Sequence, residues 1–324
     1  MRTSLLNVAA GSVLPRTDHT QRLAPIPYSE RDLPTVTAEL YFKVSDEPLA
    51  LEGPAYDRDG NLLFVNIYGG QILKLSREGS LSVVYEDPQL RPAGIAIHRD
   101  GRIFVAEVGD FKTGTIIALN CDGSHPQVVV GPEKGVVPDD LVFDSHGGFY
   151  FTDFKGSATR PTGGVYYVAP DFASVTPALP DMSGANGVAL SPNEKVLWAT
   201  EFCAGRLHRV DLVSPATAAP FGSTVPYHFV GRAPDSMRTD ADGNVYVAMY
   251  DQGRILVFSP YGIPIGQILL PGRDQNHFLK STSLAFVPGS RDLVIVSRDA
   301  IGGHGAAIFR AGGFAHGTRM FSHQ

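Results

Sequence analysis

The sequence predicts an all-β fold, a six-bladed β-propeller with four-stranded antiparallel blades in a single domain. Three observations predict it. A strand-and-turn pattern recurs six times, equivalent turns are 41 to 49 residues apart, and helical periodicity is nearly absent. The 35 glycines and 24 prolines suit short strands joined by tight turns. An α/β fold would need helices of roughly ten or more residues between strands, and we can place none.

Each copy of the pattern begins with a tight polar turn, followed by a β-branched and aromatic run, a turn containing Gly and a second such run. The first copy, "YDRDGNLLFVNIYGGQILKLSREG", shows this plan. It is typical of antiparallel strand pairs bounded by hairpin turns. The equivalent turn positions are Asp59, Asp100, His146, Asn193, Asp242 and Gly289.

The segment before the first copy predicts one strand over residues 36–44, "VTAELYFKV". We expect it to complete the last blade, because this would hide a sheet edge and close the ring. Residues 1–35, rich in Pro and polar residues, predict an irregular lead-in, so the propeller domain is expected over 36–324. We expect neither a cleaved signal nor a transmembrane segment, since polar residues interrupt the short N-terminal apolar run.

Composition narrows the partners. The chain has 43% hydrophobic and 19% charged residues and a net charge of −6, and it has no long run of Lys or Arg. We therefore expect small molecules or cations as partners, and neither nucleic acid nor membrane. Because propellers with closed rings are often monomeric and the charge pattern demands no oligomer, we expect a monomer. Cys121 and Cys203 are too few and too far apart for a disulfide framework or a zinc site. Free thiols predict a reducing compartment, the cytoplasm.

A possible metal site emerges seven residues before each turn. In a propeller the inner strand of each blade lines the channel, so equivalent positions form a ring at one mouth. Four of these six positions carry carboxylate or amide oxygens, and converging acidic groups need a cation among them. Such oxygens suit Ca²⁺ best, with Mg²⁺ or Mn²⁺ as alternatives. The six residues are Glu52, Ala93, Asp139, Asn186, Asp235 and Thr282.

A structural alternative applies to each of these positions, since Asp and Asn often precede strands as caps of local backbone groups. Four oxygen carriers at one offset favour the metal site. Seven residues after the same turns lie further polar residues, which we expect at the same mouth as an outer polar layer. These are Asn66, Glu107, Asp153 and Thr200, with Glu201 beside it.

Other chemistries find little support. The chain has no Gly-x-Ser-x-Gly elbow, no His-Glu-x-x-His motif and no phosphate-binding loop. None of the ten histidines clusters with metal-ligand spacing. His228 and His277 are either proton carriers in a substrate pocket or surface and packing residues. Trp198 predicts core packing, and Cys203 has no basic neighbour in the sequence that would activate it as a nucleophile.

Four motifs, "LEGPAYD", "PDDLVFD", "GANGVALS" and "PDSMRTDADGNVYVA", carry a family resemblance. With them, the chain resembles the senescence marker protein/gluconolactonase (luciferin-regenerating-like) family of six-bladed, metal-dependent lactonases. Within that family it is most similar to the bacterial drug-responsive lactonases. Further matching segments, such as "FDSHGGFYFTDFKG" and "NVYVAMYDQGRILVF", extend the likeness over nearly the whole chain.

This resemblance implies a calcium-dependent lactonase. It makes Glu52, Asp139, Asn186 and Asp235 the Ca²⁺ ligands, with Ser236 adding an oxygen. Asp235 is also the implied catalytic acid/base for hydrolysis of a small lactone ring. The drug-responsive members carry a second, structural Ca²⁺, but here Gly131 stands where a ligating Asp is expected, so we do not expect that second ion.

Two other functions remain open at this point. One is a calcium-binding or ligand-binding propeller without turnover, because a fold does not determine a function. The other is a side activity on phosphorus esters, which the same metal and carboxylates could serve. The sequence does not indicate which lactone is the preferred substrate.

Overall fold

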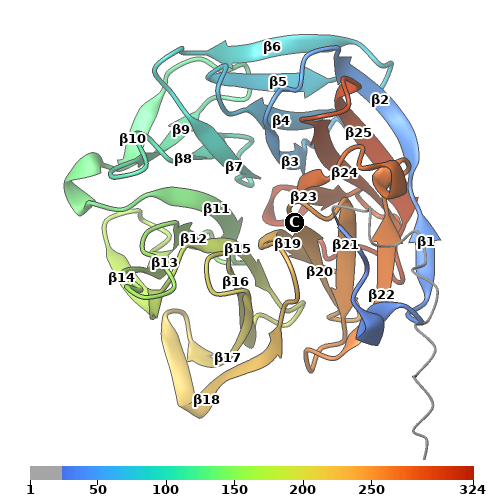
Figure 1. The fold of residues 1–324 in the computed structure, drawn as a ribbon. Coiled ribbons are helices and arrows are strands. Elements are labelled where there is room, and N and C mark those ends of the chain that lie inside the picture. Colours follow the sequence, from blue (N-terminus) through green and yellow to red (C-terminus); the bar gives the residue numbers. More distant parts are fainter. Residues whose placement is uncertain (1–23) are drawn as a thin grey trace, which may run out of the picture.

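The computed structural model describes residues 24–324, whose strands form six sheets around a central channel (Figure 1). The predicted six-bladed propeller is confirmed. The first three blades follow chain order from the inner to the outer strand. They consist of β3 (Leu51–Tyr56), β4 (Leu62–Asn66), β5 (Gln71–Leu75) and β6 (Leu81–Glu86); β7 (Pro92–Ile97), β8 (Ile103–Glu107), β9 (Thr115–Leu119) and β10 (Gln127–Val130); and β11 (Pro138–Phe143), β12 (Phe149–Asp153), β13 (Gly163–Val168) and β14 (Val175–Met182).

The last three blades continue the pattern, and short 3₁₀ helices lie at Pro132–Lys134 and Arg273–Gln275. The strands are β15 (Ala185–Leu190), β16 (Val196–Glu201), β17 (Arg206–Ser214) and β18 (Thr217–His228); β19 (Pro234–Thr239), β20 (Val245–Met249), β21 (Arg254–Phe258) and β22 (Pro264–Leu269); and β23 (Lys280–Phe286), β24 (Asp292–Asp299) and β25 (Gly305–Gly312).

Burial falls from the channel outwards. The inner strands β7, β11, β15 and β19 are buried along their whole length, whereas the outer strand β6 is mostly exposed. Blades pack face to face on their neighbours, so inner strands have protein on both sides and the core lies between adjacent sheets. Trp198 is 1% exposed within one of these interfaces, which confirms its predicted packing role.

The segment before the first blade forms two strands rather than one. β2 (Glu39–Ser45) pairs antiparallel with β25, so an N-terminal strand completes the last blade as expected. However, β1 (Thr35–Thr37) pairs in parallel with β22 of blade five. The prediction of a single strand over 36–44 is wrong in this respect. The chain crosses between blades at the buried Ala38, whose N–H donates a hydrogen bond to the carbonyl oxygen of Leu269. The segment therefore joins blades five and six.

The described part of the lead-in is anchored to blade five. A 3₁₀ helix at Tyr28–Glu30 buries Glu30, which forms an ion pair of 2.5 Å with Arg254 and accepts a hydrogen bond from the Tyr227 hydroxyl. Residues 1–23, with the N-terminal segment for which no cleaved signal is expected, lie outside the described residues.

The C-terminal segment, residues 313–324, covers one mouth of the channel (Figure 1). The carbonyl of Ser322 accepts a 2.7 Å hydrogen bond from Arg58, and the N–H of Ala241 donates to His316 at 2.7 Å. A 3₁₀ helix at Phe321–His323 ends the chain. A cavity of about 450 Å³ lies between this segment and the inner strands.

Within residues 24–324, no helix has both the length and the apolar character needed to cross a membrane. Both cysteines are free and exposed.

Candidate functional site

Each inner strand shifts its pairing register at or beside the position predicted for the ring. Such a bulge leaves a residue unpaired, bends the strand and re-aims side chains. The side chains of the six ring positions are therefore not part of a regular alternating strand. The shifts lie between Glu52 and Ala55, Pro92 and Ile95, Pro138 and Leu141, Ala185 and Val188, Pro234 and Met237, and Ser281 and Ser283.

Glycines directly after ring positions let neighbouring blades approach. A Cβ at Gly94 would lie 2.5 Å from the carbonyl oxygen of Asp139, and one at Gly187 would lie 2.6 Å from that of Asp235. Real Cβ atoms do not tolerate such contacts with backbone, so these two positions require Gly. The close approach brings residues from different blades to one point.

The structure brings the predicted site residues together at one mouth of the central channel. The C-terminal segment covers the opposite mouth. The Asn186 amide donates to the Asp139 carboxylate at 3.4 Å, which links blades three and four. The Ser236 hydroxyl lies 3.5 Å from Glu52 Oε1, which links blades five and one. All five side chains are buried: Glu52, Asp139, Asn186, Asp235 and Ser236. We call this set the oxygen ring.

The pKa values of the three carboxyl groups in the oxygen ring reflect their burial beside one another. Burial and the charge of Asp140 raise the pKa of Asp139 to about 8. Burial, followed by the charge of Asp139, raises the pKa of Glu52 well above its usual range. Burial, Glu52 and Asp139 do the same to the pKa of Asp235. Three carboxylates with raised pKa values at one point are a place where a cation would be stabilised.

The Asn186 side chain supplies an independent sign of a ligand. Its Oδ1 is buried and finds no hydrogen-bond partner among residues 24–324. Buried amide oxygens are normally paired, so an unpaired one beside three carboxylates needs an explanation. Together the donors are hard oxygens in an irregular cluster, the set that suits Ca²⁺. The residues present therefore fit that ion.

Two of the six ring positions do not contribute oxygens to this cluster. Ala93 packs with Val108 and Val137, so blade two presents an apolar wall. The Thr282 hydroxyl donates to the carbonyl oxygen of Leu51 at 2.7 Å and so fastens blade six to blade one.

The expected outer polar layer lies at the same mouth. All its members except Thr200 pair in register with the residue before the ring position of the same blade, as Asp153 does with Pro138. Their side chains form hydrogen bonds to nearby backbone groups. For example, the Asp153 carboxylate accepts a hydrogen bond from the N–H of Val137 at 2.8 Å. The Thr200 hydroxyl donates to the carbonyl oxygen of Asp235 at 2.8 Å and accepts from the N–H of Gly187 at 2.7 Å, so it joins two ring strands. The other members are Asn66, Glu107 and Glu201.

Sequence reasoning missed the ion pair behind the oxygen ring. Arg238 contacts Asp140 through two nitrogen–oxygen distances of 2.9 and 3.3 Å, and both side chains are buried. Arg238 also lines the cavity under the C-terminal segment, so the pair separates that cavity from the ring. The sequence does contain a signal for this pair. Asp140 directly follows Asp139, and Arg238 follows Ser236 by two residues, so each lies on an inner strand that also carries a member of the oxygen ring.

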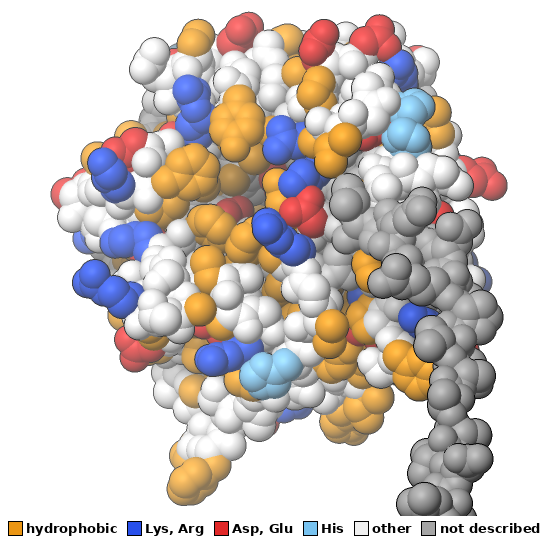
Figure 2. All heavy atoms as spheres, in the orientation of Figure 1, with side chains coloured by type: hydrophobic (Ala, Val, Ile, Leu, Met, Phe, Trp, Pro, Cys, Tyr) orange, Lys and Arg blue, Asp and Glu red, His pale blue; other side chains and the backbone are white. Residues whose placement is uncertain are grey.

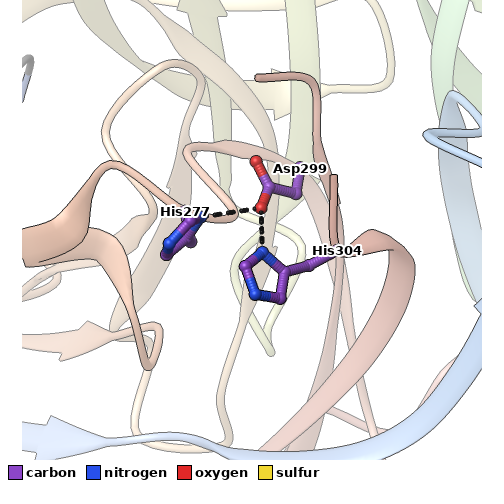
Figure 3. A group of neighbouring side chains, drawn as sticks. All are labelled: His277, Asp299 and His304. Carbon is purple, nitrogen blue, oxygen red and sulfur yellow. Dashed lines mark hydrogen bonds and ion pairs between the residues drawn. The ribbon is translucent and has the colours of Figure 1, made fainter. Parts of the chain in front are cut away.

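Two histidines come together in the structure, although none of the ten shows metal-ligand spacing in the sequence. His277 and His304 meet at Asp299 on the side of the ring mouth (Figure 3). They come from different loops of blade six, so their spacing along the chain does not resemble a local metal motif. His228 is exposed on blade four.

On the face shown in Figure 2, acidic, basic and apolar side chains are interspersed over the described residues, and neither sign of charge dominates.

Comparison with known proteins identifies the family. The family model for the SMP-30/gluconolactonase/LRE-like region matches residues 51–298, most of the propeller. The chain belongs to the SMP-30/gluconolactonase/LRE-like family. The resemblance expected from the motifs is thereby confirmed.

Relatives are similar to this family member over almost its full length. Lactonase drp35 of Staphylococcus saprophyticus is 48% identical over 316 residues, which cover 95% of this chain and 97% of that protein. Lactonase drp35 of Staphylococcus aureus (strain USA300) is 48% identical over 301 residues, 91% of this chain and 93% of that protein.

Solved structures of low identity share the fold of this SMP-30/gluconolactonase/LRE-like protein. A luciferin-regenerating enzyme superposes with a TM-score of 0.72 at 19% identity, over 88% of this chain and 99% of that one. A calcium-binding protein, regucalcin, from Agrobacterium tumefaciens superposes with a TM-score of 0.70 at 18% identity, over 89% and 99% of the two chains.

Proposed function

We propose that this chain is a calcium-dependent lactonase that hydrolyses the ester bond of a small lactone at the oxygen ring. One observation carries the proposal: three carboxylates with raised pKa values and an unpaired amide oxygen, from four blades, are buried at one mouth of the channel. The names of the two Staphylococcus relatives support the reaction, and the calcium-binding regucalcin supports the ion.

Glu52, Asp139, Asn186 and Asp235 would hold Ca²⁺, with Ser236 adding its hydroxyl oxygen. Mg²⁺ and Mn²⁺ share the preference for such oxygens and are the alternatives. When bound, the ion supplies a Lewis acid that polarises the ester carbonyl and stabilises the developing negative charge.

Asp235 is the residue we assign to proton transfer. Its Oδ1 accepts from the N–H of Ser236 at 3.1 Å, and Thr200 holds its main-chain carbonyl, so its carboxylate is positioned. In the proposed reaction it takes a proton from the attacking water as the new C–O bond forms. It returns that proton to the ring oxygen as the ester C–O bond breaks, which leaves an open-chain hydroxy acid. In the ion-free protein, burial, Glu52 and Asp139 raise the pKa of Asp235, which strengthens it as a base, whereas a bound cation acts in the opposite direction.

The experiment measures hydrolysis of a small lactone panel, including dihydrocoumarin and gluconolactone, after chelation and after Ca²⁺ is restored. We expect activity to disappear and return. Asp235→Asn, assayed with enough Ca²⁺ to match the wild-type Ca²⁺ content measured in parallel, should lower kcat/KM by about 100-fold or more. Asp59→Asn, in an exposed turn, is the control and should behave as wild type.

The outcomes separate the alternatives. Full activity of Asp235→Asn with Ca²⁺ bound would make Asp235 a ligand only. If no lactone is hydrolysed although Ca²⁺ is bound, the lactonase proposal is overturned in favour of a non-catalytic calcium- or ligand-binding propeller.

A further inference from the structure

We infer that His277, Asp299 and His304 form a second metal site, which takes a divalent transition-metal ion such as Zn²⁺ and is separate from the oxygen ring. His277 lies in the loop before β23, Asp299 ends β24, and His304 lies in the loop before β25. The three residues thus join two loops at the side of the ring mouth.

The three side chains point toward one another (Figure 3). Nδ1 of His277 and Nδ1 of His304 lie 2.9 and 2.8 Å from the same atom, Asp299 Oδ2. The ligand atoms of all three residues are within 4.8 Å of one another. Neighbouring ligands of a tetrahedral ion with bonds of about 2.1 Å are separated by about 3.4 Å. The two nitrogen–oxygen distances are shorter than this by roughly 0.5 Å, so the imidazoles would move slightly away from Asp299 to admit an ion.

The Asp299 carboxylate is held in place by backbone. It is 2% exposed, and its Oδ1 accepts from the N–H of Gly302 at 2.7 Å and from that of Ile301 at 3.4 Å. Oδ2 is left to face both imidazoles. A carboxylate fixed in this way on a rigid strand end is pre-organised for a metal, as metal ligands in proteins are normally oriented by neighbouring hydrogen bonds.

The loop backbone packs closely against the ligands at Gly302. A Cβ at Gly302 would lie 2.1 Å from His277 Nδ1 and 2.4 Å from Asp299 Oδ2. Any side chain here would therefore displace the ligands. The stretch "AIGGHGAA" thus keeps small residues around His304, which is consistent with a binding role for this loop.

The donor types select the ion. Imidazole nitrogens favour Zn²⁺, Co²⁺ or Ni²⁺, whereas Ca²⁺ requires oxygens, so the two sites would not compete for the same metal. The His304 side chain is 54% exposed, which leaves room for water to complete the shell. Asp299 also lines a cavity of about 680 Å³, which offers a path of entry.

An ion here would tie the loop before β23 to the β24–β25 loop. β23 carries the ring position Thr282, so the site would stiffen one side of the ring mouth without touching its ligands. We therefore expect metal binding to raise the Tm of the wild-type protein even when Ca²⁺ already fills the oxygen ring.

The test is a Co²⁺ titration of tag-free protein in excess Ca²⁺, followed by visible absorption and repeated with Zn²⁺ by calorimetry. We expect one equivalent to bind wild type, with a spectrum typical of nitrogen ligation and a rise in Tm. His304→Ala and Gly302→Ala should each weaken binding by at least about tenfold. His146→Ala, a single exposed histidine elsewhere, should bind as wild type.

Two results would overturn the inference: no Co²⁺ or Zn²⁺ binding by wild type, or equal binding by His304→Ala. The triad would then be a hydrogen-bonded cluster without metal. Circular dichroism of each variant checks folding. Lactone hydrolysis is not the readout, so this result stands apart from the outcome for the oxygen ring.

Discussion

Arg238 forms a two-point ion pair with Asp140 across the channel, with nitrogen–oxygen distances of 2.9 and 3.3 Å, although 98 residues separate them in the chain. The positive charge of Arg238 opposes the rise in the pKa of Glu52, whereas Asp140 contributes to it. The pair therefore ties blades three and five together directly behind the oxygen ring and influences its charge.

Removing Arg238 should destabilise the protein strongly. Arg238→Met leaves Asp140 buried without its partner, and breaking a buried pair in this way costs about 3–5 kcal/mol. Urea unfolding measures the loss. The control is Arg310→Met, which breaks the exposed pair with Asp292 and should cost about 0–1 kcal/mol. Equal losses in the two variants would show that the buried pair contributes no more to the free energy of unfolding than the exposed pair does.

Asn186→Ala should separate metal binding from stability. The change removes a buried oxygen that has no partner and also the amide's long hydrogen bond to Asp139; these effects oppose each other, so the Tm in chelator should change little. The increase in Tm on adding Ca²⁺ should shrink, because one ligand is lost. Asn186→Asp is the matched comparison: it adds a charge, so it should lower the Tm in chelator and keep the response to Ca²⁺. An unchanged Ca²⁺ response in Asn186→Ala would remove this residue from the ligand set.

The ion-free protein should become less stable as pH rises. Burial raises the pKa of Asp139 from 3.8 to about 8, so between these values the folded state binds a proton that the unfolded state has lost. Stability from this group is complete below the lower value and is lost as pH passes through the higher one. The slope is about 1.4 kcal/mol per pH unit for each proton.

Urea unfolding from about pH 5 to pH 8 in chelator measures this slope, and Asp139→Asn should reduce it, with Glu52 and Asp235 contributing the rest. Added Ca²⁺ should reverse the trend, because the ion binds the deprotonated carboxylates. A chelated wild type that gains stability towards pH 8 would contradict the expectation.

Glu30→Ala should loosen the anchor of the N-terminal segment. Glu30 is buried against Arg254 and Tyr227. Its removal leaves the buried guanidinium of Arg254 without its carboxylate partner, which costs about 3–5 kcal/mol. Thermal unfolding should show a lower Tm. Asp32→Ala, exposed in the same segment, should change little. If both variants match wild type, residues 24–34 add nothing to the stability of the propeller.

Much of the fold could be predicted because its determinants are local and repeated. Each blade carries its own turn residues and alternating strands, so six copies at a regular spacing specify a propeller without knowledge of any long-range contact. The oxygen ring followed from the same repetition, since equivalent positions on inner strands converge. Glu52, Asp139, Asn186 and Asp235 could thus be named from one offset.

Tertiary structure decided what depends on how blades and loops pack. The split of the strand expected at 36–44 depends on where the chain crosses from β22 to β25. The Arg238–Asp140 pair depends on the width of the channel, and the meeting of His277 with His304 at Asp299 depends on two loop conformations. Periodicity in a sequence identifies equivalent positions, but contacts between non-equivalent ones are set only by the packing of the folded chain.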